Sequence, residues 1–572
     1  MKIKHLFGLA VIAAMTASCS SNEDLGTAGP GTGTNEAGVG YATFTINLPS
    51  VSGTRAADAG GAEMDEGTAK EYAVKSATAL IFQKYGSDEG SCKFVESVDL
   101  PTAAADWTDD TTGGITTTSK KLVAKLTNVD TKNQYYVLVL LNNNKTGGVK
   151  VPLPTVGQSY NEWNSQILNP SVDDLAADND FYMANAPLKG TASPTTLVTI
   201  NKENIYSSKE KAEAGTSAAT VYVERGVAKM SVNDPKTKTV IDKATNTSTQ
   251  STVEFNNWAL DITNKKTYAV HNIDGLSTDF PAIWTTPRFI GTNSRVYWGK
   301  DPNYNLDNLN TGKEAEREAE FNFIKATSGI NKTFTESAYC LENTFNLANM
   351  YQGQTTRVIF KATYTPKDDA GNPLAEQDGT FYTIGNMTNI LNEAALKTAV
   401  NTAATSVLPG CTVDYTNLKT EGSHVITLAD IKDSTGTTLV ADKDYNGKTG
   451  TKIVKEINDK LGLIDGAGHA EAMVGINTYL KGATYYIARV KHFSSLTWQS
   501  GESYGDNNLK YLGRYGMLRN NWYELNVGNV YGPGYPGVPP VDPNQPDDEN
   551  EKYLSVSVKI LSWAKRSDTV DL

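Results

Sequence analysis

Cysteine is scarce in this chain, and its few cysteines exclude a disulfide-stabilised scaffold. Four cysteines occur in 572 residues, and Cys92, Cys340 and Cys411 lie far apart beyond the N-terminal region. Three widely spaced cysteines supply neither a disulfide framework nor the CxxC spacing of a metal site. At most one pair can form, so we expect buried free thiols, with the pairing of Cys340 and Cys411 left open.

Signals of catalysis and of nucleic-acid binding are also missing. The chain has five histidines, none spaced from another ligand-type residue as a metal site requires, and it contains no HExxH, Walker A, GxSxG or Rossmann motif. Its net charge of −12 disfavours a nucleic-acid partner. The sequence therefore argues for no enzyme and no cofactor, although a hydrolase with an unrecognised site stays an alternative.

One segment partly matches a calcium-binding loop. Asp442, Asp444 and Asn446 alternate before a glycine, as in the first half of an EF-hand loop. The ninth position is Gly450, however, and the twelfth is Ile453 in place of the bidentate glutamate. The segment is a weak calcium candidate, and a tight Asx-type turn is the simpler interpretation.

Long apolar runs are absent after the first residues, and the N-terminal run is too short to cross a bilayer as a helix. Basic residues precede the apolar segment Leu6–Met15, and the small residues 16–18 precede Cys19. This order of regions predicts a lipoprotein signal peptide over 1–18 and lipidation of Cys19, for example by palmitate. An ordinary signal peptide with an incidental cysteine is the alternative. The polar residues 20–40 then read as a flexible tether.

Short alternating or apolar segments separated by turn residues dominate the rest of the chain. They predict strands at 77–83, 135–141, 219–232, 253–262, 356–364, 380–384, 483–490 and 522–530. Helical spacing of apolar residues predicts helices only at 313–324, 387–404 and 452–461. The expected fold class is all-β with minor helical insertions, because β-branched and aromatic residues favour strands.

The expected organisation has two β-sandwich domains between a removable N-terminal region and a C-terminal strand. We expect a signal peptide at 1–18, a propeptide at 19–55, an N-terminal sandwich at 56–245, a C-terminal sandwich at 246–530, a Pro/Gly-rich linker at 531–550 and a final strand within 551–572. The boundary at 245/246 is placed in the polar run 243–251.

The most informative pattern is shared by the two ends of the chain. Residues 554–560 (LSVSVKI) and residues 43–48 (TFTINL) both alternate polar and apolar positions. The C-terminal strand follows a linker that is too rich in proline and glycine to be expected to pack. An apolar strand face held away from its own domain needs a groove, which the N-terminal strand would occupy until it is removed.

Arg55 offers a way to remove that strand. It lies in a loop of small residues, 50–61, directly after the strand of Phe44, Ile46 and Leu48. Such loops are preferred sites of proteolysis, so a trypsin-like or Arg-specific protease would cut between Arg55 and Ala56. The alternative is an ordinary exposed arginine.

Cleavage would then permit strand exchange. If the N-terminal strand fills an edge position of the first domain, its departure opens an apolar furrow with unpaired backbone groups. A strand donated by another copy would fill it, with Leu554, Val556, Val558 and Ile560 facing inward. A slip by one residue would turn Ser and Lys inward, so the register is well specified. The contact is heterologous and produces an open filament.

These features together resemble a known family. The chain is similar to the type V pilins of Bacteroidota, the fimbrillin family, and within it to the stalk subunit of the minor-fimbria type. The resemblance rests on 223–229 (VERGVAK), 519–523 (RNNWY), the ending 554–563 and the terminal 570–572, together with Cys19 and Arg55.

The resemblance implies two transthyretin-like sandwiches, export through the periplasm as an outer-membrane lipoprotein, and cleavage at Arg55–Ala56. It also implies donation of the strand from Leu554 to Trp563 to the next subunit of a cell-surface fimbrium. Expected partners are other copies of the chain, anchor and tip subunits, a processing protease and surface ligands in adhesion and biofilm formation.

Two other functions stay open at this point. A fimbrial tip subunit lies close in sequence, although the long linker and complete final strand favour a stalk. A surface glycan-binding lipoprotein would use Trp284, Trp298 or Trp498 as sugar platforms, whereas packed tryptophans are the commoner case.

Overall fold

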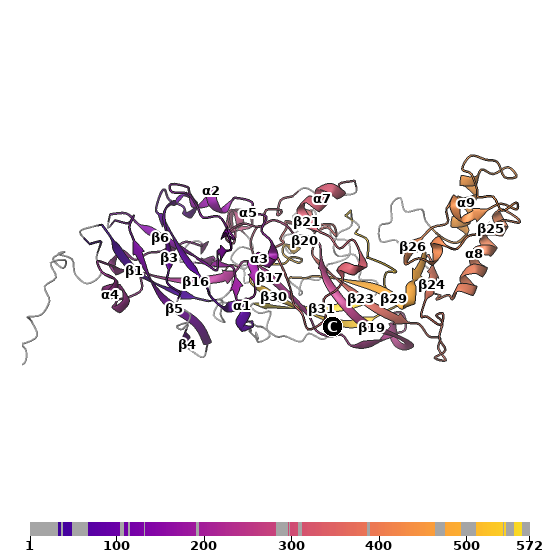
Figure 1. Cartoon of the computed structure of the whole chain (residues 1–572), viewed down its shortest axis with the longest axis horizontal. Helices are drawn as coiled ribbons and strands as arrows, with labels where there is room; N and C mark the ends of the chain where they lie inside the picture. Colours follow the sequence, from indigo (N-terminus) through magenta and orange to yellow (C-terminus); the bar gives the residue numbers. More distant parts are fainter. Residues whose placement is uncertain are drawn as a thin grey trace, which may run out of the picture.

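The chain is all-β with minor helical insertions, as predicted. The computed structural model describes residues 33–35, 38–48, 67–102, 108–112, 115–130, 132–189, 194–281, 296, 298–306, 312–385, 389–463, 475–492, 511–541, 543–544 and 554–562. Figure 1 shows an elongated molecule, with one sheet toward one end, a second sheet in the middle and a module containing two helices at the far end. No helix among these residues is long and apolar enough to cross a membrane.

The first sheet surrounds one hydrophobic core. Its strand order is β3 (Lys93–Leu100), β2 (Ala77–Gln83), β6 (Tyr135–Leu141), β11 (Met183–Asn185), β16 (Ala219–Arg225), β1 (Gly40–Asn47), β5 (Ile115–Leu126) and β4 (Thr108–Thr112); β14 (Val198–Thr199) pairs with β6, and β15 (Ile205–Tyr206) with β1. β2 and β6 have the predicted bounds. The sequences of these two strands are nearly continuous apolar runs, because almost every residue of both strands is buried.

The second sheet lies in the middle of the molecule and has its own core. Its order is β22 (Ala338–Cys340), β17 (Ala228–Val232), β30 (Asn521–Val530), β18 (Thr237–Asp242), β19 (Thr247–Asp261), β23 (Arg357–Thr365) and β29 (Ala483–Arg489), with β31 (Leu554–Ser562) paired to β30. Whether either sheet has transthyretin-like connectivity stays a prediction.

The chain changes from one sheet to the other at Gly226 and Val227, which corrects two predictions. The expected strand 219–232 is two strands, β16 and β17, and they belong to different sheets. Gly226 fits here because a Cβ would lie 2.7 Å from the Tyr182 ring. The expected boundary at 245/246 falls in the β18–β19 hairpin, where Asp242 accepts hydrogen bonds from the amides of the polar turn.

A buried polar network joins the two sheets at this crossover. The Arg225 amide donates to Asn520 Oδ1 (3.0 Å), and the Asn520 amide donates to the Val227 carbonyl (2.8 Å). Lys229 Nζ lies 2.7 Å from Glu71 Oε1, on the short helix α1 (Ala69–Tyr72), and 3.7 Å from the centroid of the Trp522 ring. The sheets are thus linked through side chains of the VERGVAK and RNNWY motifs.

A third core, absent from the sequence prediction, forms the far end of the molecule (Figure 1). It contains β24 (Phe381–Ile384), α8 (Glu393–Val407), β25 (Thr412–Val413), β26 (Gly422–His424), β27 (Ile431–Lys432), α9 (Gly450–Lys460) and β28 (Ile476–Tyr479). This module is inserted between β23 and β29, which pair with each other. The helices predicted at 387–404 and 452–461 are α8 and α9, begun at the N-caps Asn392 and Thr449.

Shorter elements complete the described structure. The helix expected at 313–324 is α7 (Glu314–Glu320), which ends earlier than predicted. The chain then forms the short strand β21 (Phe321–Asn322). The others are α2 (Tyr160–Asn164), α3 (Val172–Leu175), α4 (Lys209–Ala214), α5 (Leu276–Asp279), β7 (Asn144–Lys145), β8 (Gly148–Val149), β9 (Ala176–Ala177), β10 (Asp180–Phe181), β12 (Leu188–Lys189), β13 (Pro194–Thr195), β20 (Thr263–Asn264) and 3-10 turns at 89–91, 202–204, 327–329, 347–349, 417–419, 428–430 and 480–482.

Candidate strand-exchange site

The predicted removable strand is β1, and it lies inside the first sheet. β1 is parallel to β16 on one side and antiparallel to β5 on the other, from Phe44 to Asn47 and from Gly40 to Asn47 respectively. The expectation of an edge position is therefore wrong. An alternating strand reveals which face is buried but not how many neighbours the strand has, so this error is inherent in the pattern.

One face of β1 is completely buried in the core. Phe44 and Ile46 are 0% exposed and Leu48 is 4% exposed, so these side chains lie in the core; their role in a removable strand stays a prediction. Ala42 is also 0% exposed and extends the same face by one position. Its small side chain carries a weak apolar signal, which is why the sequence prediction omitted it.

The other face of β1 is held by polar contacts beside α4. Thr43 Oγ1 donates to the Ala212 carbonyl at 2.6 Å, and Thr45 Oγ1 lies 2.6 Å from Ser217 Oγ. Asn47 Nδ2 donates to the Val221 carbonyl at 3.3 Å. This covered polar face restricts which side chains a replacement strand can carry.

The predicted donor strand is β31, which is antiparallel to β30 of its own chain (Figure 1). Val558 pairs with Leu525, Val556 with Val527, and Ile560 with Tyr523. These three β30 residues belong to the second core. Trp563 lies outside the described residues.

The linker before β31 is packed along its first half, contrary to expectation. The backbone of Tyr535 pairs in both directions with Tyr485 (2.9 and 2.7 Å), and the Tyr486 hydroxyl donates to the Gly532 carbonyl. Arg357, held by Asp261 at 2.8 Å, donates to the carbonyls of Pro539 (2.7 Å) and Pro540 (3.0 Å). We call residues 531–541 the strap. Proline removes amide donors but leaves carbonyl acceptors, and the strap uses these.

Several predicted site residues fall outside the described part of the chain, namely Cys19, Arg55 and Ala56. Their assigned roles stay predictions. Cys92, Cys340 and Cys411 are free and buried, so Cys340 and Cys411 are not paired in this structure.

The calcium candidate forms a turn before α9. Asp444 Oδ1 accepts a hydrogen bond from the Gly447 amide at 3.1 Å, and Asn446 has a φ of 57°. Across the described ranges, no three Asp, Glu, His or Cys side chains are grouped as a metal site would require. This geometry favours the Asx-type turn over Asp442, Asp444 and Asn446 as ion ligands.

The aromatic and histidine candidates that the structure describes are engaged in packing. Trp298 is 0% exposed in a core cluster, whereas Trp284 and Trp498 lie outside the described residues. His271 Nδ1 lies 2.8 Å from Glu224 Oε1, and His492 Nδ1 lies 2.8 Å from the Tyr523 hydroxyl, all buried. A buried Trp298 cannot serve as a sugar platform.

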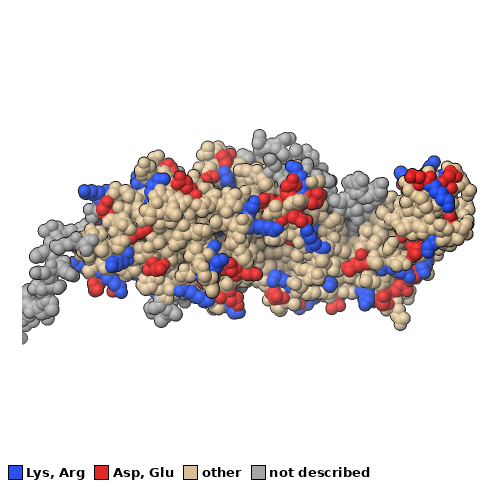
Figure 2. Space-filling view, turned by 45° about the horizontal axis from the view of Figure 1, so that its top comes forward, with Lys and Arg blue, Asp and Glu red and all other residues tan. Residues whose placement is uncertain are grey.

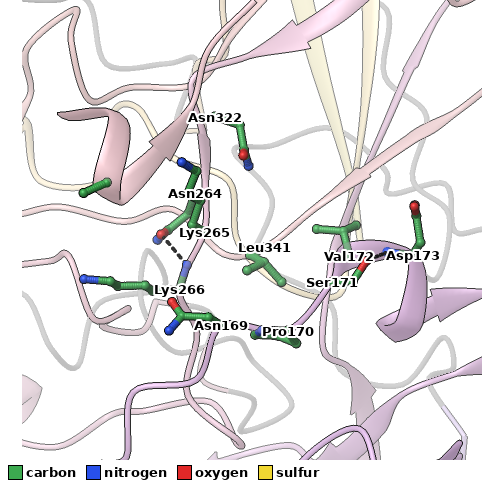
Figure 3. A pocket seen from close by; sticks show the side chains of 11 residues that line it. Asn169, Pro170, Ser171, Val172, Asp173, Asn264, Lys265, Lys266, Asn322 and Leu341 are labelled. Carbon is green, nitrogen blue, oxygen red and sulfur yellow. Dashed lines mark hydrogen bonds between the residues drawn. The ribbon is translucent and has the colours of Figure 1, made fainter. Parts of the chain in front are cut away.

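A cavity of about 700 Å³ opens where the two sheet regions meet (Figure 3). It is lined by segment 169–173 from one side and by 264–266, Ala319, Asn322 and Leu341 from the other. Lys266 Nζ is paired with Glu320 at 2.6 Å, and Asn264 Oδ1 accepts from the Lys266 amide. The lining side chains that carry charge are Asp173, Lys265 and Lys266.

Two carboxyl groups, that of the half-buried Glu89 and that of the buried Asp301, have pKa values raised above the usual range. Burial raises the pKa of Glu89 to about 7, although the amides of Thr196 and Leu197 donate to it. Burial likewise raises the pKa of Asp301 to about 7 against the donors of Thr344 and Asn303. Each carboxyl group accepts hydrogen bonds from backbone amides, which indicates a structural role. On the face in Figure 2, acidic and basic residues are interspersed.

A comparison with protein families identifies the C-terminal part of the chain. Residues 477–569 match the family described as major fimbrial subunit protein type IV, fimbrillin, C-terminal. This C-terminal segment is therefore similar to fimbrillins. The matched segment contains β29, β30, the strap and β31, and the match supports a fimbrial subunit.

Comparisons with individual proteins add little to this. No curated protein matches the chain. Among solved structures it is similar to a fimbrial assembly protein from Parabacteroides distasonis, with 11% identity over 56% of this chain and 81% of that chain, at a TM-score of 0.26. A TM-score this low supports no inference about fold or function.

Proposed function

We propose that this protein is a fimbrillin, the stalk subunit of a cell-surface fimbrium that polymerises by strand exchange. In this proposal the precursor is lipidated at Cys19, exported to the outer membrane and cleaved between Arg55 and Ala56. β1 then leaves, and β31 of another copy takes its place. Anchor and tip subunits complete a fimbrium that supports adhesion and biofilm formation.

The observation that carries the proposal is the position of β1. It pairs with strands on both sides, yet it is joined to α1 only through residues 48–68, where Arg55 is the sole basic residue. Burial of Phe44, Ile46 and Leu48 stabilises the first domain by about 1.5–3 kcal/mol each. A domain that loses this strand has two unpaired sheet edges and an open core, so it needs a replacement.

The exchange is favourable for the donor strand as well. Among the described strands, β31 is hydrogen-bonded only to β30. In the slot left by β1, it would pair with β16 and β5 together. The donor strand therefore gives up one ladder of backbone hydrogen bonds and gains two. Because donor and slot belong to different copies, repetition of this contact yields a filament.

Cleavage at Arg55 is tested by the variant Arg55→Ala, with Arg55→Lys as its matched control. After trypsin treatment, the wild type and Arg55→Lys should begin at Ala56 and form SDS-resistant ladders and visible fibres. Arg55→Ala should remain uncut between residues 48 and 69 and stay monomeric. N-terminal sequencing, gel electrophoresis and electron microscopy provide the readouts.

Ladders formed by uncut Arg55→Ala would contradict cleavage-gated assembly. A wild-type chain that starts at Ala56 but never polymerises would contradict strand exchange itself. A glycan-binding lipoprotein would instead bind its ligand equally well in all three chains.

A further inference from the structure

The two faces of β1 dictate how a replacement strand can enter the slot. We propose that the donor strand enters in the direction of β1, with Leu554 at the place of Ala42, and that Ser555 and Ser557 take over the hydroxyl contacts of Thr43 and Thr45. This inference rests on the proposed function and adds the direction, the register and two specificity-determining residues.

Seven consecutive positions match in this alignment. The apolar residues Leu554, Val556, Val558 and Ile560 fall at the places of Ala42, Phe44, Ile46 and Leu48, all 4% exposed or less. Leu554 is larger than Ala42, whereas Val556 and Val558 are smaller than Phe44 and Ile46. Because alternate residues on one face are neighbours, the extra volume of Leu554 lies beside the space that the Phe44 ring vacates.

The polar positions match in chemistry as well as in place. Ser555 and Ser557 fall at Thr43 and Thr45, and each serine carries a hydroxyl on Cβ as threonine does. The Ala212 carbonyl and Ser217 Oγ, each 2.6 Å from a β1 hydroxyl, would otherwise lose these partners. Thr43 is only 1% exposed, so a carbonyl left without a donor there would be costly.

The reverse direction fails at the single charge of the donor strand. With the same four apolar positions inward, reversal moves Lys559 from the place of Asn47 to that of Thr43. Thr43 lies buried in mid-strand beside α4, where an ammonium group has little access to water. Asn47 is 8% exposed, more than the 1% of Thr43; it is the last residue of β1, and its side chain already donates to the Val221 carbonyl, as a lysine can.

Direction is tested by paired cysteines in the full-length chain after cleavage at Arg55. Thr43 is opposite Val123 of β5, and Asn47 is opposite Ser119. The same-direction alignment puts Ser555 opposite Val123, whereas reversal puts it opposite Ser119. The variant Ser555→Cys/Val123→Cys should therefore form disulfides between subunits under mild oxidation. Ser555→Cys/Ser119→Cys should form at least about tenfold fewer.

Each outcome of this test has a definite meaning. Preferential cross-linking of residue 555 to residue 119 would overturn the direction, and polymers with neither cross-link would overturn the register. Failure of the cleaved wild type to polymerise would contradict the proposed function and this inference with it. The chain with its native cysteines alone is the control for background oxidation.

The hydroxyl contacts are tested by Ser557→Ala, Ser217→Ala and the double variant. Each single substitution should weaken assembly about fivefold, as expected for one hydrogen bond. The double variant should be no weaker than either single variant, because both remove the same contact. Ser562→Ala, in the same strand but beyond the matched positions, should assemble like the wild type. Equal effects of Ser562→Ala and Ser557→Ala, or additive effects of the pair, would contradict the proposed contacts.

Discussion

At the scale of single residues, buried charges hold the two sheet regions together. Burial alone would raise the pKa of Glu71, but Lys229 at 2.7 Å and the Tyr339 hydroxyl at 2.6 Å lower it overall. Arg519 and Glu342 form a second buried pair, with their side chains 3.2 Å apart. Removing one member of such a pair would leave an uncompensated buried charge, which typically costs about 3–5 kcal/mol.

Glu89 predicts a stability that depends on pH. Folding raises its pKa from 4.5 to about 7, so the folded protein binds more protons than the unfolded chain between these values. Stability attributable to Glu89 should therefore fall as pH rises from about 4.5 to 7. Glu89→Gln should be more stable than the wild type at pH 8, by about 2–3 kcal/mol, and should differ little at pH 4.5.

Urea unfolding at both pH values measures this difference. Glu213→Gln, which neutralises an exposed member of the Lys209 ion pair, is the control for net charge. An equal stability of Glu89→Gln and wild type at pH 8 would show that the Glu89 carboxylate is not penalised by burial.

At the scale of elements, the strap shows how a proline-rich segment becomes ordered. Gly534 approaches the second sheet so closely that a Cβ would lie 2.1 Å from the Tyr485 carbonyl oxygen. Tyrosine hydroxyls and the Arg357 guanidinium donate hydrogen bonds to carbonyls of the strap. These bonds require no amide hydrogen from the strap, so its prolines do not prevent them. Sequence composition predicts the lack of a regular strand here but not this docking.

Gly534→Ala should detach the strap from β29. The backbone pair between Tyr535 and Tyr485 should then lose protection against hydrogen exchange, by about tenfold or more, while the amides of β30 remain protected. Gly537→Ala is the matched control, because its Cβ would meet only the Gly422 Cα at 3.8 Å. Equal protection of the Tyr535 amide in both variants would contradict the tight docking of the strap.

At the scale of the whole molecule, β1 and the two-helix module lie toward opposite ends (Figure 1). The module leaves and rejoins the rest of the chain at paired strands, with Ile384 opposite Ile476. The Gly385 amide donates to the Gly475 carbonyl at 2.8 Å. Most of the module's core therefore lies between Gly385 and Gly475. Joining these two glycines directly would turn the paired strands β24 and β28 into a hairpin.

Deletion of residues 386–474 should leave the rest of the fold intact. It joins Gly385 to Gly475 as a two-residue Gly-Gly hairpin loop, a favoured connection for antiparallel strands. The deletion variant would also carry Ile384→Thr and Ile476→Thr, because both isoleucine side chains lose their contacts with the module's core. We expect cooperative unfolding and fibre formation after cleavage at Arg55, because the apolar face of β1 lies in the first core and β31 pairs with β30 of the second sheet.

Circular dichroism and electron microscopy test the deletion. A folded variant that is cleaved but forms no fibres would show that the module takes part in assembly. A variant that fails to fold would show that the module supports the second sheet.

Much of this architecture follows from the sequence alone. The continuous apolar runs of β2 and β6 specify buried strands, and alternation in 43–48 and 554–560 specifies strands with one apolar face. Helical spacing identifies α8 and α9, and composition establishes the all-β class. These are local properties, because side-chain periodicity of about 2 or 3.6 is set by the backbone conformation itself.

Only the tertiary structure decided which strands are neighbours. It placed β1 between β5 and β16, moved the change of sheet to Gly226, paired β31 with β30 and docked the strap on β29 through Arg357 and tyrosine hydroxyls. Strand partners are chosen by long-range packing and backbone pairing between segments that are distant in sequence. The alternating pattern thus determined by itself which residues of β1 face the core, while the fold determined that the N-terminal slot is closed on both sides.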